Sequence, residues 1–157
     1  MFNSEHNRSG FLDAGADLLR RLPDAVPADW IDGIRQRSSV VPVPVELPDI
    51  APAPAAPPDG RGPLIVWNHR WEYDKGPDAL VAALRALAAD DVPFRVAVCG
   101  EQFRTVPDSL SVGLDALGDR VVHRGWLPSR ADYLALLARA EIAVSTAIHE
   151  FFGVSMV

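Results

Sequence analysis

The hydrophobic and polar positions along the chain define two parts with a proline-rich stretch between them. Eight of the 14 prolines lie between Pro42 and Pro63. Because proline fixes φ and lacks an N–H donor, we expect residues 48–62 to form an extended connector instead of a packed element. The pattern therefore predicts three segments, which are residues 1–47, 48–62 and 63–157.

The first segment has the pattern of two helices followed by a strand. Leucines and a phenylalanine share one helical face over Ser9–Leu22, with Ser9 or Asn7 as the expected cap. A second helix is expected at Ala28–Arg37, and Val40–Val45 has the composition of a strand interrupted by prolines. A segment this short cannot build a good core of its own. We therefore interpret it as part of something larger.

The longer second segment alternates between two kinds of pattern. Short apolar runs bounded by turn residues predict strands at Leu64–Trp67, Phe94–Cys99, Val121–His123 and Ile142–Thr146. Helical spacing of apolar residues predicts helices at Pro77–Ala89 and Arg130–Ala140. Such alternation is typical of an α/β fold with a parallel sheet and helices on both faces. Ligands of such sheets bind at the carboxyl ends of the strands, so the loops after the strands are where we expect chemistry.

Composition excludes several classes of function. The 157 residues carry a net charge of −6, which argues against binding nucleic acid mainly through a basic field. No run of 18 apolar residues predicts a membrane span, and the polar start at Met1–Arg8 lacks the pattern of a secretory signal. The single cysteine, Cys99, cannot form an internal disulfide or a cysteine-based zinc site, and we expect it to be a buried thiol in a protein of the reducing cytoplasm.

The loop after the first predicted strand of the second segment carries the strongest candidate chemistry. Arg70 and Lys75 lie five residues apart, and Gly76 follows them immediately before a predicted helix. Two cations at a helix N-terminus are suited to clamp a diphosphate. The alternative is that Arg70 pairs with Glu72 or Asp74 on a solvated loop.

The later loops offer weaker candidates. Gly100, at the end of a strand, is suited either to close approach of a ligand or to an ordinary turn. Trp126 is interpreted as a core tryptophan. Glu150 lies among apolar residues, and a buried carboxylate must accept hydrogen bonds, for which sugar hydroxyls are suitable donors. His149 is either a donor-sugar ligand or a core histidine, and free N–H groups after Gly153 would suit a phosphate or sugar oxygen. The sequence contains no P-loop, GxGxxG, CxxC or HExxH motif.

Two of these loops together resemble a known family. Arg-x4-Lys-Gly at residues 70–76 and His-Glu-x-Phe-Gly at residues 149–153 resemble the motifs of family 4 retaining glycosyltransferases. These enzymes have two Rossmann-like domains, the GT-B fold. The resemblance implies that Arg70 and Lys75 hold the donor diphosphate, that Glu150 holds the hexose hydroxyls, and that these three carry the catalysis. It also implies donor-binding roles for Asn68, His69, Gly76, Gly100, His149, Phe152, Gly153 and Val154, with no metal and no cofactor beyond the nucleotide-sugar substrate.

The match is closer to one branch. The stretches FNSEHNRSGFLDAGADLLRRLPD, VWNHRWEYDKGPDAL and STAIHEFFGVSMV resemble the tRNA-queuosine mannosyltransferases. This resemblance implies GDP-mannose as donor and queuosine in tRNA as acceptor. Another donor or acceptor, or a catalytically silent nucleotide-sugar-binding remnant, is the alternative.

From the resemblance we also expect the chain to be a fragment of a longer protein. The family's second glutamate would fall at position 158, one past Val157. Residues 1–47 would be the tail of the acceptor-side domain, and residues 63–157 about half of the donor-binding domain. We therefore expect marginal stability or an exposed apolar face. The oligomeric state is not predicted.

Overall fold

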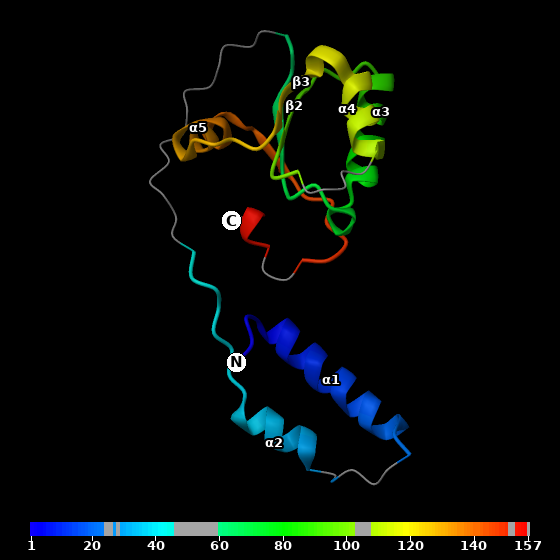
Figure 1. Ribbon diagram of the computed structural model, residues 1–157, viewed down its shortest axis with the longest axis vertical. Helices are drawn as coiled ribbons and strands as arrows, with labels where there is room; N and C mark the ends of the chain where they lie inside the picture. Colours follow the sequence, from blue (N-terminus) through cyan, green and yellow to red (C-terminus); the bar gives the residue numbers. More distant parts are fainter. Residues whose placement is uncertain (24–26, 28, 46–59, 103–107, 151–152, 157) are drawn as a thin grey trace. The chain divides into compact units, whose positions relative to one another are not determined.

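A computed structural model describes residues 1–23, 27, 29–45, 60–102, 108–150 and 153–156 (Figure 1). The chain divides into two compact units, Met1–Glu46 and Leu47–Val157. Most of the predicted connector, residues 48–59, lies outside the described residues, and so do Phe152 and the side chain of Val154.

The first unit contains two helices, α1 (Glu5–Arg21) and α2 (Trp30–Arg37). The predicted start of α1 was wrong: the helix begins earlier because Ser4 caps it, with the Ser4 hydroxyl accepting a hydrogen bond from the Asn7 N–H at 3.1 Å. Leu12 is its buried residue among those described.

The strand predicted at Val40–Val45 is also wrong. The structure has a single parallel bridge, between Phe2 and Val40, in which the Val41 N–H donates to the Phe2 carbonyl at 2.8 Å. Pro42 and Pro44 have no N–H to donate, so the pairing does not continue along the chain.

The second unit is built on a parallel sheet, as predicted. Its strands are β1 (Leu64–Asn68), β2 (Arg95–Cys99), β3 (Val121–Gly125) and β4 (Ile142–Val144). Their order in the sheet is β3-β2-β1-β4, and every pair is parallel. The α-helices are α3 (Pro77–Ala89), α4 (Asp108–Leu117) and α5 (Arg130–Arg139), and the short 3-10 helices are η1 (Tyr73–Lys75), η2 (Gly118–Arg120) and η3 (Val154–Met156).

Helices cover both faces of this sheet. Figure 1 shows α3 and α4 together on one side of the strands and α5 on the other. One core cluster joins α3 and α4 to Trp67, Val96 and Val98 of the strands. A second joins the opposite face of β1 and β2 to Leu136 and Leu137 of α5. This arrangement is an α/β Rossmann-like fold, as expected.

Helix α4 is an element that the sequence analysis missed. Its interior holds Gly113, which lowers helix propensity. A Cβ placed at Gly113 would come within 2.4 Å of Val81 Cγ1 on α3. The glycine therefore lets the two helices approach closely, and this reason is visible only in the packed structure.

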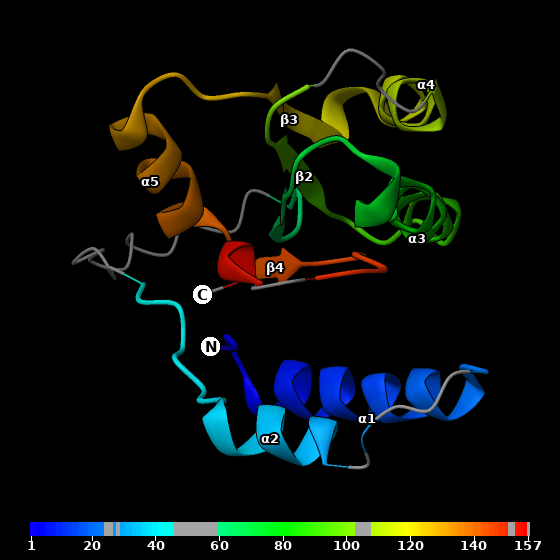
Figure 2. The ribbon, with the colours of Figure 1, turned by 60° about the horizontal axis from the view of Figure 1, so that its bottom comes forward.

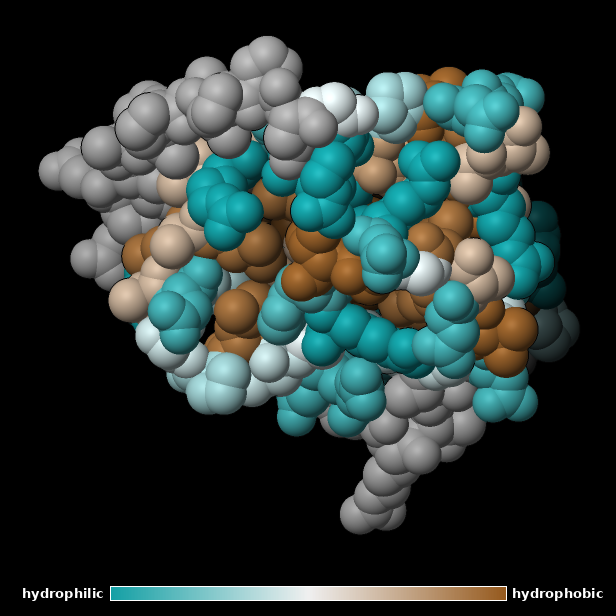
Figure 3. Space-filling model, turned by 90° about the horizontal axis from the view of Figure 1, so that it is seen from above, coloured by the Kyte–Doolittle hydropathy of each residue, from teal (hydrophilic) through white to brown (hydrophobic). Residues whose placement is uncertain are grey.

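The sheet order defines where the chain reverses direction across the sheet. From β1 the chain moves to β2 and β3 on one side and later returns to place β4 on the other side of β1. β1 and β4 therefore flank the topological switch point, and ligands of such folds bind beside the loops that follow these two strands. Figure 2 shows the segment after β4 turning back toward η3. Figure 3 shows hydrophilic and hydrophobic residues interspersed on the face seen from above.

Candidate functional site

A cleft of about 470 Å³ lies at the carboxyl ends of the strands. It is lined by Asn68, the last residue of β1, and by residues that follow the four strands: His69, Arg70, Lys75, Gly100, Glu101, Trp126, Glu150, Gly153 and Ser155. The cleft therefore brings together seven of the residues singled out by the motifs, which come from segments up to 85 positions apart, from Asn68 to Gly153.

Two glycines allow the loop after β1 to lie against its neighbours. Gly76 has φ 63°, and a Cβ there would come within 2.1 Å of the Thr146 carbonyl oxygen. Gly100 has φ 126°, and a Cβ there would come within 1.9 Å of the His69 carbonyl oxygen. A side chain at either position would collide with backbone, so glycine is required by both space and conformation.

Thr146 connects the loop after β4 to the loop after β1. Its hydroxyl accepts a hydrogen bond from Trp67 Nε1 at 2.9 Å and donates one to the Lys75 carbonyl at 2.9 Å. The Ile148 N–H donates to the Asp74 carbonyl at 2.8 Å. These hydrogen bonds hold the loop after β4 beside Lys75.

Lys75 is buried at the base of the cleft, where it contacts three oxygens. Its Nζ lies 3.0 Å from the His149 carbonyl oxygen, 3.1 Å from Glu150 Oε1 and 3.2 Å from Asp74 Oδ2. Burial by itself would lower the pKa of Lys75, but its hydrogen bonds to Glu150 and Asp74 hold that pKa above the ordinary value. The side chain is therefore a fixed cation at neutral pH.

His69 is also buried, and its ring faces residues from three segments. Nε2 lies 2.9 Å from Ser145 Oγ, while Nδ1 lies 3.3 Å from Ser155 Oγ and 3.4 Å from Glu150 Oε1. Burial lowers the pKa of His69, with Lys75 acting in the same direction and Glu150 and Asp74 opposing it. The imidazole is therefore neutral at pH 7.

Arg70 lies at the mouth of the cleft. Its side chain is 54% exposed and pairs with Glu72, with NH2 3.0 Å from Oε2. The pairing considered as the alternative from sequence is thus present, and Arg70 lines the cleft at the same time. An exposed pair of this kind contributes little to stability.

The remaining predicted residues have varied surroundings. Asn68 lines the cleft and donates from Nδ2 to the Tyr133 hydroxyl at 2.6 Å. The interpretation of His149 as a core histidine was wrong, because the residue is exposed; its carbonyl, not its ring, contacts Lys75. Gly153 lines the cleft with φ 66°. Cys99 is buried as predicted, and burial raises the pKa of its thiol to about 11.

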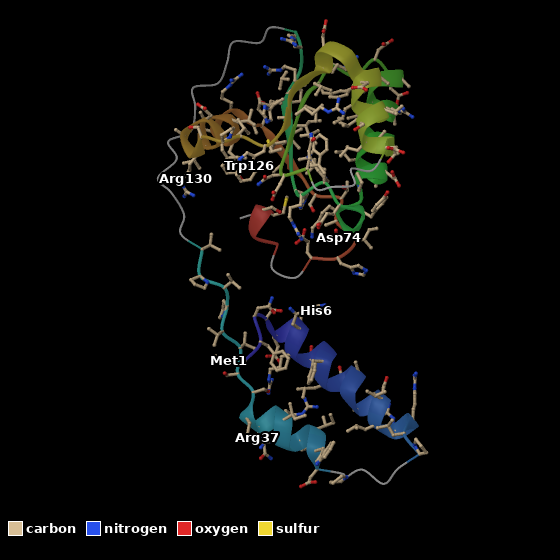
Figure 4. The ribbon with its side chains drawn as sticks, in the orientation of Figure 1. Met1, His6, Arg37, Asp74, Trp126 and Arg130 are labelled. Carbon is tan, nitrogen blue, oxygen red and sulfur yellow. The ribbon has the colours of Figure 1, made fainter. Side chains whose placement is uncertain are left out.

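The interpretation of Trp126 as a core residue was wrong. It is 66% exposed and lines both the cleft and a neighbouring cavity of about 360 Å³, because Gly125 ends β3 and the chain leaves the sheet there. Figure 4 labels Trp126 together with Asp74 of the loop after β1 and Arg130 at the start of α5. Residue type alone favoured a buried tryptophan, so nothing short of the fold would have placed it correctly.

Sequence reasoning also missed three residues that serve the site. Ser145 and Ser155 contact His69, and Tyr133 contacts Asn68. Serine and tyrosine at such positions carry no motif, so no signal in a single sequence could have found them.

Taken together, the cleft combines two cations with a carboxylate at the switch point of a parallel sheet. Arg70 and Lys75 can neutralise an anionic group, and Glu150 can accept hydrogen bonds from hydroxyls. Among the described residues, no group of three or more histidine, cysteine or acidic side chains has the arrangement to hold a metal ion. No helix in the part that the structure describes combines the length and apolar character needed to cross a bilayer.

The fold and the place of the cleft define the class as an α/β Rossmann-like domain, consistent with the GT-B architecture expected from the motifs. Residues 1–45 match a family model described as tRNA-queuosine alpha-mannosyltransferase N-terminal. The chain is 34% identical over 163 residues to the tRNA-queuosine alpha-mannosyltransferase of Drosophila melanogaster, an alignment that covers 99% of this chain and 43% of the fly protein. These comparisons confirm the family resemblance, and the chain spans less than half the length of this curated relative.

Proposed function

We propose that this chain supplies donor-site residues of a retaining glycosyltransferase that transfers mannose from GDP-mannose to queuosine in tRNA. The observation that carries the proposal is the contact between Lys75 and Glu150, 3.1 Å apart at the switch point of the sheet. It joins the two motifs on which the family resemblance rests. The name of the fly relative supports the mannosyl group and the tRNA acceptor.

In this proposal Arg70 and Lys75 hold the donor diphosphate. Negative charge grows on the diphosphate as the glycosidic bond breaks, and fixed cations stabilise that charge more in the transition state than in the ground state. Arg70 offers a planar fork at the mouth, whereas Lys75 offers a point charge at the base. The proposal assigns the neutralisation of the diphosphate to these side chains and calls for no metal.

Binding of a phosphate requires Lys75 to exchange one of its present partners. An ammonium group has three protons, and Lys75 Nζ already faces three oxygens. Asp74 is 40% exposed in its side chain, against 31% for Glu150. We therefore assign the exchange to Asp74, which water can reach most readily, so that Glu150 keeps its contact with Lys75 while it accepts from the sugar.

The donor assignment is tested by calorimetric titration of the full 157-residue chain with GDP-mannose. The variants are Arg70→Ala and Lys75→Met, and the matched control is Arg85→Ala, an exposed cation on α3 outside the cleft. We expect each cleft variant to weaken binding by about 10-fold or more, since each removes a charge-assisted hydrogen bond. Equal binding by all four proteins would refute the diphosphate assignment.

The same titration separates the alternatives. Tighter binding of UDP-glucose than of GDP-mannose would replace the proposed donor, and absence of binding to either nucleotide sugar would favour a silent remnant. The acceptor is tested with radiolabelled GDP-mannose and tRNA that contains queuosine, with tRNA lacking queuosine as control. Label in the first tRNA alone supports the proposal, whereas donor binding without transfer would limit this chain to holding the donor.

A further inference from the structure

We propose that His69 is a positioning residue that fixes Glu150 through a neutral imidazole ring whose proton is on Nδ1. The choice of the nitrogen that carries the proton rests on the geometry. Its consequence for ligand binding rests on the proposed function, because it concerns the carboxylate to which the sugar is assigned.

The ring of His69 is held from several sides. It lies at the end of β1 with a side chain that is 2% exposed, and its edge meets the Trp67 ring at a centroid distance of 5.1 Å. Ser145, just after β4, faces Nε2, and Ser155 of η3 faces Nδ1. A ring packed in this way has a single orientation, so each nitrogen has a defined partner.

The partners determine which nitrogen carries the proton. Glu150 Oε1 contacts the ammonium of Lys75, so this carboxylate is ionised and can only accept hydrogen bonds. The ionised carboxylate, 3.4 Å from Nδ1, favours an N–H on that nitrogen, and the Ser155 hydroxyl oxygen, 3.3 Å from Nδ1, is the hydrogen-bond acceptor for that proton. In a neutral ring Nε2 is then an acceptor.

Ser145 completes this hydrogen-bond chain in the matching direction. Its hydroxyl lies 2.9 Å from Nε2, and its oxygen accepts from the Ala147 N–H at 3.4 Å. The Ser145 proton is thus available to donate to Nε2. The directed chain runs from the Ser145 hydroxyl through His69 to the Ser155 hydroxyl, and the Nδ1 N–H lies beside Glu150 Oε1.

The charges around the ring are compatible with a neutral imidazole. Glu150 and Asp74 favour the protonated ring, whereas burial and Lys75 oppose it, and the balance lowers the pKa of His69. Glu150 belongs to the loop after β4, and Asp74 and Lys75 belong to η1. At neutral pH the ring therefore presents an N–H toward Glu150 and is not a second cation beside Lys75.

As a consequence, the Glu150 carboxylate has one oxygen, Oε1, held in place. Among the described residues, the contacts of Glu150 are to Oε1, from Lys75 Nζ and from His69 Nδ1. Oε2 is then the oxygen that is directed to a sugar hydroxyl. Loss of the N–H beside Oε1 would let the carboxylate rotate about its last bond and weaken that recognition.

The proton assignment is tested on the full chain by long-range ¹H–¹⁵N correlation of the imidazole rings at pH 7. The other histidines, His6, His123 and His149, serve as internal references. We expect His69 to be neutral with the proton on Nδ1, and Ser145→Ala to change the Nε2 shift of that ring. A proton on Nε2, or a charged ring at pH 7, would overturn the assignment, whether or not any ligand binds.

The positioning role is tested by two near-isosteric variants. The amide nitrogen of His69→Asn lies near the place of Nδ1 and can still present an N–H to Ser155 and Glu150, whereas that of His69→Gln reaches toward Ser145. We expect His69→Asn to bind GDP-mannose at least about 5-fold more tightly than His69→Gln, because only His69→Asn keeps an N–H beside the carboxylate. Urea unfolding of both variants identifies a difference due to folding alone.

The control for this comparison is His123→Gln on β3, outside the cleft lining. Equal affinities of His69→Asn and His69→Gln, both close to that of the unsubstituted chain, would refute the positioning role. If the unsubstituted chain itself does not bind GDP-mannose, the proposed function fails, and the tautomer measurement still decides the state of His69.

Discussion

The base and the mouth of the cleft are held in different ways. His69 and Lys75 at the base are 5% and 9% exposed and contact backbone and side chains from the loop after β4. Arg70 and Trp126 at the mouth are largely exposed, the tryptophan at 66%. At the base, the groups proposed to bind ligand also connect the loops, so their loss affects both folding and binding. At the mouth, loss of a side chain proposed to bind ligand should affect binding but hardly affect folding.

Glycines account for much of this difference. Gly76 allows the loop after β1 to contact the backbone at Thr146, and Gly100 allows the loop after β2 to contact the carbonyl of His69. Close backbone contact then buries the side chains between the loops. Gly125, by contrast, ends β3 and releases Trp126 into solvent, and a Cβ there would meet its nearest atom, Gln102 Nε2, only at 3.5 Å.

The largest expected effect comes from breaking the contact at the base. Gly76→Ala places a methyl group within 2.1 Å of the Thr146 carbonyl oxygen at a φ of 63°. We expect a loss of about 3 kcal/mol or more in the free energy of unfolding, because the residue is both strained and overpacked. Urea unfolding followed by circular dichroism measures it.

The matched control is Gly118→Ala, which has a similar φ of 53° but no atom within 4 Å of the added Cβ. It isolates the conformational cost, which is about 1 kcal/mol. Equal losses for the two substitutions would show that the contact between the loops does not constrain the base.

A smaller effect separates the two cations. Lys75→Met leaves Glu150 and Asp74 without their cation, and because both carboxylates are partly solvated we expect about 1–2 kcal/mol of destabilisation. Arg70→Met removes an exposed pair and should change the free energy of unfolding by less than about 0.5 kcal/mol. Both should weaken GDP-mannose binding.

The comparison of base and mouth predicts this separation, with binding lost in both variants and stability lost in one. Thermal unfolding and calorimetry on the same preparations measure the two quantities. A destabilised Arg70→Met, or a fully stable Lys75→Met, would remove the distinction.

The smallest effect is a dependence on pH. Burial is the main cause of the lowered pKa of His69, so below about pH 6.5 the unfolded chain takes up this proton more readily than the folded chain. Stability should therefore fall as the pH falls from 6.5 toward the lower folded pKa. The free energy of unfolding measured at pH 6.5 and at pH 5.5 should differ less in His69→Asn than in the unsubstituted chain. A slope that is equal in the two proteins would assign the acid sensitivity to other groups.

The sequence predicted the elements with strong local signals. The helix Pro77–Ala89 agrees with α3 at both ends, because Pro77 marks its first turn and its apolar residues repeat at helical spacing. The parallel sheet followed from the alternation of strands and helices. Helix α4 did not, since Gly113 lowers its local propensity and has its purpose only in the contact with Val81.

The candidate site was also predicted only where the sequence carries a local signal. Arg70, Lys75 and Glu150 were found from the motifs that contain them, although their roles in binding a donor stay predictions. The exposure of Trp126 was predicted wrongly, because burial depends on how the chain leaves β3 and not on residue type.

The sequence by itself therefore determined the fold class and the two motifs, because periodicity, proline and charged residues act over a few neighbouring positions. The tertiary structure alone decided that Lys75 meets Glu150, and that His69 lies between Ser145 and Ser155. These contacts join residues about 75 to 86 positions apart, so they exist only once the parallel strands place their carboxyl ends side by side.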